Sequence, residues 1–378
     1  MINSFCSSTM NLKYSVEKNT NYKYNNDLVI QEVFDGTLIP LEKNRSYNST
    51  DNYYGGVYDE MMNLLPLSLN SRVSPPNFEY NFNQWYSGYN TDTFSYSKKT
   101  ENINVIFLGA FHPHFGHFIL ESISRLWIFL ESSYSDFEYV YISEKDISID
   151  YLKLIQLFGI DISKLRRITE PTTFSRIIIP EMSLCLHSHY HLNYKKIINK
   201  ITEKIPSIPS NKIYYLSRRN IKNSRVFGEI TIEYILKKLN VEFIYPESLS
   251  IIDLIHKLKS CKKIIAISGT NSHNSIFMQE KSNLICLNRS QHYHPPQSMI
   301  DDFKNLNTLY IDVFLFSKVD WSSGPFYLYP TKHFHNWISA EFKQKIKINP
   351  SIFLQVIFEF LKFLYINFKN SIIKLIYK

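Results

Sequence analysis

A histidine pair and a glutamate lie at spacings that suit proton transfer. His114, His117 and Glu121 occupy positions i, i+3 and i+7, which places them on one face at the start of a helix. An imidazole exchanges a proton near neutral pH, and a neighbouring carboxylate either orients the ring or is itself the base. We therefore expect a general base here, either His117 or Glu121. In the alternative interpretation, His117 caps the helix and Glu121 pairs with Arg125 on a solvated face.

Three arginines in the second half of the chain suit a phosphorylated ligand. Arg218 and Arg219 follow the apolar run 212–217, and Arg225 comes soon after them. A guanidinium group presents paired N–H donors that match two phosphate oxygens. Arginine clusters are often only a solvated rim, but a place at the carboxyl end of an expected strand favours binding of a diphosphate.

A polar loop with a glycine follows another apolar run, KIIAI at 263–267. A loop between a buried parallel strand and a helix presents free backbone N–H groups to a phosphate or a sugar hydroxyl. Glycine lets the backbone approach such a ligand closely. Glu247, after a Tyr-Pro turn, is a candidate acceptor for hydrogen bonds from a ribose or base. The candidate ligand-binding residues of the loop are Ser268, Gly269, Thr270, Asn271, His273 and Asn274.

A regular alternation of strands and helices positions these candidates. Its order is that of the nucleotide-binding half of an α/β enzyme. Ser250 is expected to cap a helix, with Asp253 at the capping-box position. Strands are expected at 212–217, 242–245, 263–267 and 284–287, and helices at 229–239 and 249–261.

A similar alternation in the first half predicts another Rossmann-like domain. Residues 1–100 show only short strand candidates, such as 28–34, and Pro206 and Pro209 mark a linker. Strands are expected at 102–108, 138–143 and 175–180, and helices at 119–130 and 149–158. The expected parts of the chain are an N-terminal extension of the first domain at 1–100, a first domain at 101–205, a second domain at 212–330 and a C-terminal helical segment at 335–378.

Two ordered blocks of sequence resemble glycosyltransferase family 61. The block HPHFGHFILESISRLW is similar to the family's N-terminal signature, and the stretch from YLSRRN to SGTNSHNSIFM is similar to its C-terminal half. Two blocks in the same order are more specific than either alone. The chain departs from the family in the loop after the late strand, usually Gly-x-His-Gly-Ala, and near Asn288, where an acidic residue is common.

This resemblance implies an inverting, nucleotide-sugar-dependent and metal-independent transferase without a cofactor. It also implies the GT-B type of α/β fold, in which two Rossmann-like domains, one for the acceptor and one for the donor, face a cleft. His117, Glu121 and His114 then become the catalytic candidates. The arginines, Glu247 and the loop become the donor-binding candidates. We expect the acceptor to be a growing cell-surface glycan or glycolipid, such as capsule or lipopolysaccharide, while the donor, the linkage and the oligomeric state stay open.

Composition agrees with two domains. The chain has 378 residues, of which 44% are apolar and 15% aromatic, enough for a sizeable core. The cysteines Cys6, Cys185, Cys261 and Cys286 form no CxxC pair. This argues for a reducing compartment and against a disulfide framework or a thiolate metal site.

The charge indicates anionic partners. The net charge is +8 and the pI is near 9.0, which suits a nucleotide sugar, a phospholipid or nucleic acid. Nucleic acid is not expected, since no RNP-like strand or recognition helix is found. The N-terminus does not read as a signal peptide, and no uncharged run of 18 apolar residues occurs. We expect a cytoplasmic location.

The segment 351–378 is dense in Phe, Ile and Leu and is interrupted by Glu359. A basic, aromatic-rich helix can lie in the headgroup plane of an anionic membrane. We expect this helix to hold the protein at the inner face of the cytoplasmic membrane, because its apolar residues cover too wide a face for packing along one narrow helix–helix contact. The alternative is a core helix. The basic residues of the segment are Lys362, Lys369, Lys374 and Lys378.

Histidine clusters support a different class of function. Imidazoles on one strand face can hold zinc, so a metallohydrolase is an alternative, although no HExxH helix or Cys pair accompanies them. A non-catalytic glycan-binding assembly protein is a further alternative, but a lectin does not need two Rossmann-like halves. The clusters are His112, His114 and His117, then His187, His189 and His191, then His292 and His294.

Overall fold

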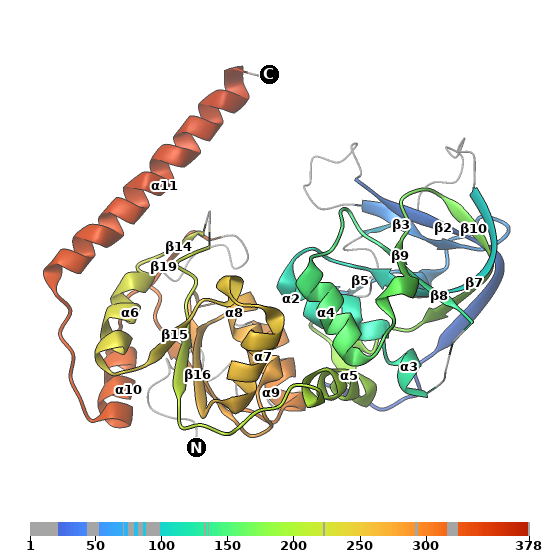
Figure 1. Cartoon of the computed structure of the whole chain (residues 1–378). Helices are drawn as coiled ribbons and strands as arrows, with labels where there is room; N and C mark the ends of the chain where they lie inside the picture. Colours follow the sequence, from blue (N-terminus) through green and yellow to red (C-terminus); the bar gives the residue numbers. More distant parts are fainter. Residues whose placement is uncertain are drawn as a thin grey trace. The chain divides into compact units, whose positions relative to one another are not determined.

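The chain divides into two compact units, which are described separately below. One comprises residues 21–206, and the other contains residues 207–378 (Figure 1). The computed structural model describes residues 22–43, 53–70, 72–74, 79–81, 86–87, 99–131, 134, 136–221, 224–291, 294–315 and 324–376.

Residues 21–206 contain a seven-stranded mixed sheet with the order β6-β3-β2-β10-β7-β8-β9. Strands β10, β7, β8 and β9 run parallel, whereas β2 pairs antiparallel with both β10 and β3. The parallel half follows the expected alternation of strands and helices. The strands are β2 (Ile30–Lys43), β3 (Tyr53–Tyr58), β6 (Tyr86–Ser87), β7 (Lys99–Ala110), β8 (Glu138–Ile142), β9 (Leu165–Arg167) and β10 (Thr172–Pro180).

The N-terminal part of the sheet differs from the sequence prediction. A short strand was expected at 28–34, but β2 is 14 residues long. Its first part pairs with β10, with Leu38 opposite Thr172 and Ile30 opposite Pro180, and its later part pairs with β3. Leu38 is fully buried in the core of this unit. Pairing with a central strand therefore extends β2 beyond the short apolar run visible in the sequence.

The continuous helix expected at 119–130 is wrong. The structure has α2 (Phe115–Leu120), a 3-10 turn η3 (Ser122–Arg125) and α3 (Ile128–Glu131) instead. The Ser124 backbone amide and hydroxyl both donate to the Glu121 carbonyl, at 3.1 and 2.6 Å. Serine side chains compete for backbone groups in this way, and here they tighten the chain into a 3-10 turn.

Two longer helices complete this unit. The helix α4 (Ile149–Phe158) begins at the N-cap Ser148 and ends at Gly159, which has a positive φ of 114°; it confirms the helix expected at 149–158. The helix α5 (Leu192–Glu203) packs against α4. A small sheet comprises β1 (Lys23–Tyr24), β11 (Leu184–Cys185) and β12 (His189–His191), and a hairpin comprises β4 (Arg72–Ser74) and β5 (Glu79–Asn81).

Residues 207–378 contain a five-stranded, fully parallel sheet with the order β15-β13-β16-β17-β18. In chain order this is 2-1-3-4-5, a doubly wound arrangement whose direction of winding reverses between β13 and β16. All four strands expected from the sequence are confirmed. The strands are β13 (Ile213–Leu216), β15 (Glu242–Ile244), β16 (Lys263–Ile267), β17 (Asn283–Asn288) and β18 (Asn307–Asp312).

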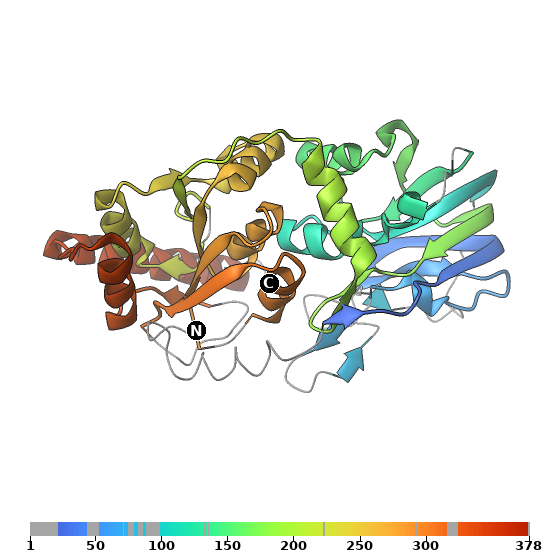
Figure 2. The same ribbon diagram turned by 90° about the horizontal axis from the view of Figure 1, so that it is seen from below.

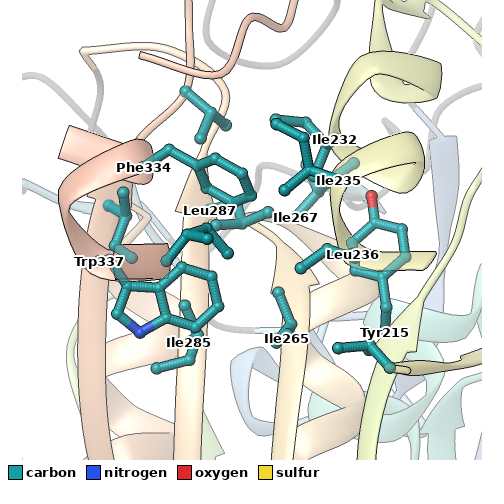
Figure 3. Close-up of a cluster of buried hydrophobic side chains, with 14 of the residues drawn as sticks. Tyr215, Ile232, Ile235, Leu236, Ile265, Ile267, Ile285, Leu287, Phe334 and Trp337 are labelled. Carbon is teal, nitrogen blue, oxygen red and sulfur yellow. The ribbon is translucent and has the colours of Figure 1, made fainter. Parts of the chain in front are cut away.

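Helices cover both faces of this sheet (Figures 1 and 2). Ile232 and Leu236 of α6 pack with Ile265 and Ile285 of the strands and Trp337 of α10, and all are buried (Figure 3). The expected helices at 229–239 and 249–261 are confirmed. The helices are α6 (Glu229–Lys238), α7 (Ile251–Ser260), α8 (Thr270–His273), α9 (Pro295–Phe303) and α10 (Lys332–Phe342), and a strand pair comprises β14 (Val226–Phe227) and β19 (Phe326–Tyr327).

The predicted cap of α7 is confirmed. The Ser250 hydroxyl accepts a hydrogen bond from the Asp253 backbone amide at 3.2 Å and donates to the Asp253 carboxylate at 2.6 Å. This arrangement satisfies an N–H group that the first helical turn leaves without a partner.

The last helix, α11 (Pro350–Ile376), packs on its own unit through its first part. Ile352 is buried, and the Phe360 ring lies 6.0 and 5.4 Å from the rings of Phe227 and Tyr327. No described helix is long and apolar enough to cross a membrane. The exposed large apolar side chains of α11 are Phe353, Leu354, Ile357, Phe358, Leu361, Leu364, Tyr365 and Phe368.

Candidate functional site

The switch point of the parallel sheet gathers several of the candidate residues. Arg218 follows the end of β13, and Ser268 and Gly269 directly follow β16. These two strands are hydrogen-bonded neighbours on either side of the reversal in winding. In open parallel sheets, ligands bind outside the carboxyl ends of the strands at this point. The edge is therefore the candidate ligand-binding site of residues 207–378.

Arg218 is half-buried at this edge. Its backbone amide donates to Glu229 Oε1 at 2.8 Å. Its side-chain Nε is buried and has no hydrogen-bond partner among the described residues. Burial lowers the pKa of Arg218, and the nearby carboxylates of Glu229 and Glu247 oppose that shift. A guanidinium group in this state has spare hydrogen-bonding capacity for an anion.

Glu229 supports the Arg218 segment from the start of α6. Its side chain is buried and accepts from the Tyr215 hydroxyl at 2.7 Å as well as from the Arg218 amide. Burial raises the pKa of Glu229 to about 7. The sequence analysis did not single out this residue, because a glutamate in the first turn of a helix normally reads as a solvated, dipole-compensating residue.

The other two predicted arginines have different surroundings. Arg219 NH1 lies 2.9 Å from Glu233 Oε2, and its NH2 lies 3.8 Å from Glu359 Oε1 of α11. Arg225 is exposed, and its carbonyl accepts from the Phe326 amide at 2.7 Å where β14 pairs with β19. Arg219 therefore already has carboxylate partners within its own unit.

Arg289 is a cation at this edge that sequence reasoning missed. It directly follows β17, the strand next to β16, and its backbone amide donates to Ser268 Oγ at 3.3 Å. Burial and the positive charge of Arg218 lower the pKa of Arg289 to about 10. The available signal was its position two residues beyond the strand expected at 284–287, beside the place where the family's acidic residue is replaced.

The predicted loop 268–274 is shorter than expected, since α8 begins at Thr270 and the loop proper is Ser268 and Gly269. Asn271 and Asn274 are buried, and the side-chain amide of Asn274 donates to the backbone carbonyl of Asn271 at 2.9 Å. The side-chain carbonyls of both asparagines have no partner among the described residues. His273 is buried beside His294, with ring centroids 5.1 Å apart. Glu247 is exposed in the 3-10 turn η5 (Pro246–Ser248).

The histidine site of residues 21–206 lies where β7 leads into α2. His117 Nδ1 is 2.6 Å from Glu121 Oε2. The His117 side chain is 36% exposed, whereas the Glu121 side chain is only 1% exposed. The His117 ring stacks on His112 at 4.4 Å, and the His114 ring lies 5.5 Å away. The structure thus brings together the three predicted residues and adds His112.

This geometry separates the roles of the pair. A carboxylate that accepts from one ring nitrogen fixes the tautomer and orientation of the imidazole. Nδ1 of His117 is directed at Glu121, so a proton exchanged with another molecule would pass through the other ring nitrogen, Nε2. His117 is the better placed of the two candidate bases, because its side chain is partly exposed whereas that of Glu121 is almost fully buried.

The alternative of a solvated Glu121–Arg125 pair is wrong, because both residues are at most 2% exposed. Arg125 donates to the carbonyl oxygens of Pro180 and Leu69, the latter at 2.9 Å. The alternative in which His117 caps the helix is also wrong, since the N-cap of α2 is His114, which makes no side-chain capping bond.

The remaining histidines do not assemble a metal site in the described part of the chain. His189 and His191 lie on β12 beside Tyr24, with ring centroids 4.8 and 6.5 Å from the tyrosine ring, while His187 has a positive φ of 66°. No group of three or more His, Cys, Asp or Glu residues that could hold a metal ion occurs among the described residues. Cys6, His292 and Lys378 lie outside them.

Comparison with known protein families gives a match over part of the chain. The family model described as Glycosyltransferase 61 matches residues 115–285, which confirms the resemblance. The matched stretch includes the His117–Glu121 pair and the sheet edge with Arg218 and Gly269. No curated protein matches the chain.

Proposed function

We propose that this member of glycosyltransferase family 61 is an inverting enzyme that transfers a sugar from a nucleotide-sugar donor to a growing cell-surface glycan, such as capsule or lipopolysaccharide. The GT-B arrangement is part of the proposal. The observation that carries it is the family match, which spans a paired histidine and carboxylate in one unit and a cationic switch-point edge in the other.

His117 is the general base in this proposal. The acceptor hydroxyl oxygen attacks the anomeric carbon of the donor sugar, and its proton passes to Nε2 of His117. The bond between the anomeric carbon and the phosphate oxygen breaks, so the leaving nucleotide carries away the bonding electrons. Glu121 holds the ring through Nδ1 and stabilises the imidazolium that forms.

Arg218 binds the phosphate end of the donor. Its buried Nε has no hydrogen-bond partner among the described residues, and a phosphate oxygen would satisfy it. A cation at this place stabilises the negative charge that develops on the leaving group. No metal ion is needed for this step, so a chelator is expected to leave the rate unchanged. A metallohydrolase would lose its activity.

The exposed stripe of α11 is the proposed contact with an anionic membrane at its cytoplasmic face. Leu354, Ile357, Phe358, Leu361 and Phe368 are exposed and follow helical spacing. Because the first part of the helix packs on the sheet unit through Ile352 and Phe360, the stripe is presented on a helix already fixed at its base. The lysines of the sequence add attraction to anionic headgroups.

Thermal unfolding in the presence of a panel of nucleoside diphosphate and monophosphate sugars tests the donor assignment. One donor should raise the melting temperature of the wild-type chain. At a donor concentration of 100 times Kd, the expected stabilisation is about 2.7 kcal/mol. Arg218→Ala should weaken the binding of that donor by about 1.5 to 3 kcal/mol. The matched control is Arg176→Ala. Arg176 and its partner Glu32 both lie in residues 21–206, so this change should leave donor binding as in the wild type. Stabilisation by no sugar nucleotide would contradict the proposal.

A further inference from the structure

The Arg289 guanidinium has two close neighbours at the switch-point edge. Its guanidinium carbon lies 4.0 Å from the centre of the Phe326 ring. A second neighbour is Gly269, where an added Cβ would come within 3.0 Å of Arg289 Nη2. Gly269 has φ 106° and ψ −156°, a backbone conformation essentially confined to glycine. The glycine therefore serves two purposes, because it allows the turn after β16 and leaves room for the guanidinium group.

The Phe326 ring is itself fixed from the backbone. The Phe326 amide donates to the Arg225 carbonyl at 2.7 Å, and β19 pairs with β14. Phe326 is buried. The ring thus forms a stable support, and stacking on it orients the plane of the Arg289 guanidinium without using any of its N–H donors.

The charge of Arg289 is not neutralised by a neighbour. Among the described residues, no carboxylate forms an ion pair with Arg289 and no group accepts a hydrogen bond from its guanidinium. Burial lowers the pKa of Arg289, and the positive charge of Arg218 lowers it further. Two like charges held together at partial burial disfavour each other. Such an arrangement is stabilised when an anion binds to both.

We propose that Arg289 and Arg218 together bind the diphosphate of the donor, one from each side of the loop after β16, with Gly269 between them. This inference rests on the proposed function and assigns to it a residue outside the matched segment. The strand order places β16 between β13 and β17, so Arg218 and Arg289 follow the strands on either side of β16. Planar N–H forks at both flanks match the oxygens of two linked phosphates.

Arg219 shows what a cation without this role looks like at the same edge. Its guanidinium is already paired with the carboxylate of Glu233 at 2.9 Å. A phosphate would have to displace that carboxylate. Arg289 replaces Arg219 as the expected second cation of the donor site.

Calorimetric titration of the full chain with inorganic pyrophosphate tests the assignment. The wild type should bind pyrophosphate more tightly than inorganic phosphate. Arg289→Gln and Arg218→Gln should each weaken pyrophosphate binding by about 10- to 100-fold. Arg289→Lys keeps the charge but loses the planar fork, and should fall between the wild type and Arg289→Gln. Arg176→Gln is the matched control for loss of one positive charge, and its affinity should equal that of the wild type.

The outcomes separate this inference from the proposed function. Wild-type affinity in Arg289→Gln with weakened binding in Arg218→Gln would overturn the role of Arg289 and leave the donor site in place. Equal weakening in Arg176→Gln, or no pyrophosphate binding by the wild type, would also overturn it. If Arg289→Gln unfolds at the assay temperature, Arg289→Lys provides the test. Wild-type affinity of Arg289→Lys for pyrophosphate, with an unchanged preference for pyrophosphate over phosphate, would overturn the role of the planar guanidinium. The proposed function fails separately, if no sugar nucleotide binds or is consumed.

Discussion

The two units each hold an arginine against a glycine at the end of a strand, but only one of these arginines has hydrogen-bond acceptors for its guanidinium among the described residues. In residues 21–206, Gly109 has φ 93°, and a Cβ there would lie 2.8 Å from Arg125 Nε. In residues 207–378, Gly269 stands in the same relation to Arg289. Arg125 is 1% exposed and donates to two backbone carbonyls. Arg289 has an aromatic ring and a like charge as its neighbours.

The difference teaches how to distinguish a structural cation from a binding cation. A buried charge is tolerated when hydrogen bonds replace its hydration. Arg125 meets this condition and joins η3 to the end of β10. Arg289 does not meet it within the described chain, which indicates that its partner is a ligand.

The largest expected effect is on stability, and it compares the two arginines directly. Arg125→Met leaves the carbonyls of Pro180 and Leu69 buried without donors, and should lower the free energy of unfolding by about 3 to 5 kcal/mol. Arg289→Met should lower it by about 1 kcal/mol or less, since only a stacking contact is lost. Chemical denaturation of both variants measures this. Equal losses would remove the distinction between them.

A smaller effect concerns the pH dependence of stability through Glu229. The pKa of about 7 in the folded chain lies above the ordinary value of 4.5. The folded state therefore takes up a proton more readily, and its stability decreases as the pH rises from about 4.5 to 7. Glu229→Gln removes this dependence while its side-chain carbonyl still accepts from Tyr215 and Arg218. Its stability relative to the wild type should rise by on the order of 1 to 3 kcal/mol between pH 5 and pH 8.

Melting temperatures over that pH range provide the measurement. Glu247→Gln, at an exposed glutamate of the same unit, is the control and should show no such trend. A constant difference between Glu229→Gln and the wild type at all pH values would mean that the carboxyl group ionises as in the unfolded chain.

The smallest expected effect per residue is at α11, where each lysine should contribute about 1 kcal/mol of attraction to an anionic surface. The full chain should sediment with anionic vesicles, bind neutral vesicles weakly and be released by salt. Deletion from Pro350 is a poor test, because it removes Ile352 and Phe360 from the packed base of the helix. Removal of residues 361–378 should abolish sedimentation and leave a folded protein.

A variant with Gln at the four lysines after Phe360 retains the apolar residues and isolates the contribution of charge. It should bind anionic vesicles less tightly than the wild type. Aggregation of the chain that lacks 361–378 would show instead that this part of the helix belongs to the core.

Much of the parallel sheet could be predicted because its residues carry local signals. The run KIIAI became β16 without a change of bounds, and Ser250 and Asp253 formed the expected cap. The break after Leu120 was not visible, since the apolar residues from Ile119 onward keep helical spacing. Only the hydrogen bonds of Ser124 to the Glu121 carbonyl reveal it.

The candidate site was predictable where its residues are close in sequence. The His117–Glu121 contact follows from i, i+4 spacing. The approach of Arg289 to Arg218 depends on the order of β13, β16 and β17 in the sheet, which strand patterns do not specify. Arginines adjacent in sequence were therefore grouped, although Arg219 has carboxylate partners of its own.

One comparison tests the central claim most directly, namely that the cationic edge binds the donor and His117 moves the proton. Donor affinity and turnover should be measured for His117→Ala, Glu121→Gln and Arg218→Ala with the sugar nucleotide identified by thermal unfolding. His117→Ala should lower turnover by about 100-fold or more with unchanged donor affinity, and Glu121→Gln should act in the same direction. Arg218→Ala should weaken donor affinity. Near-normal turnover in both variants of the dyad, or loss of donor affinity in His117→Ala alone, would contradict this division of roles.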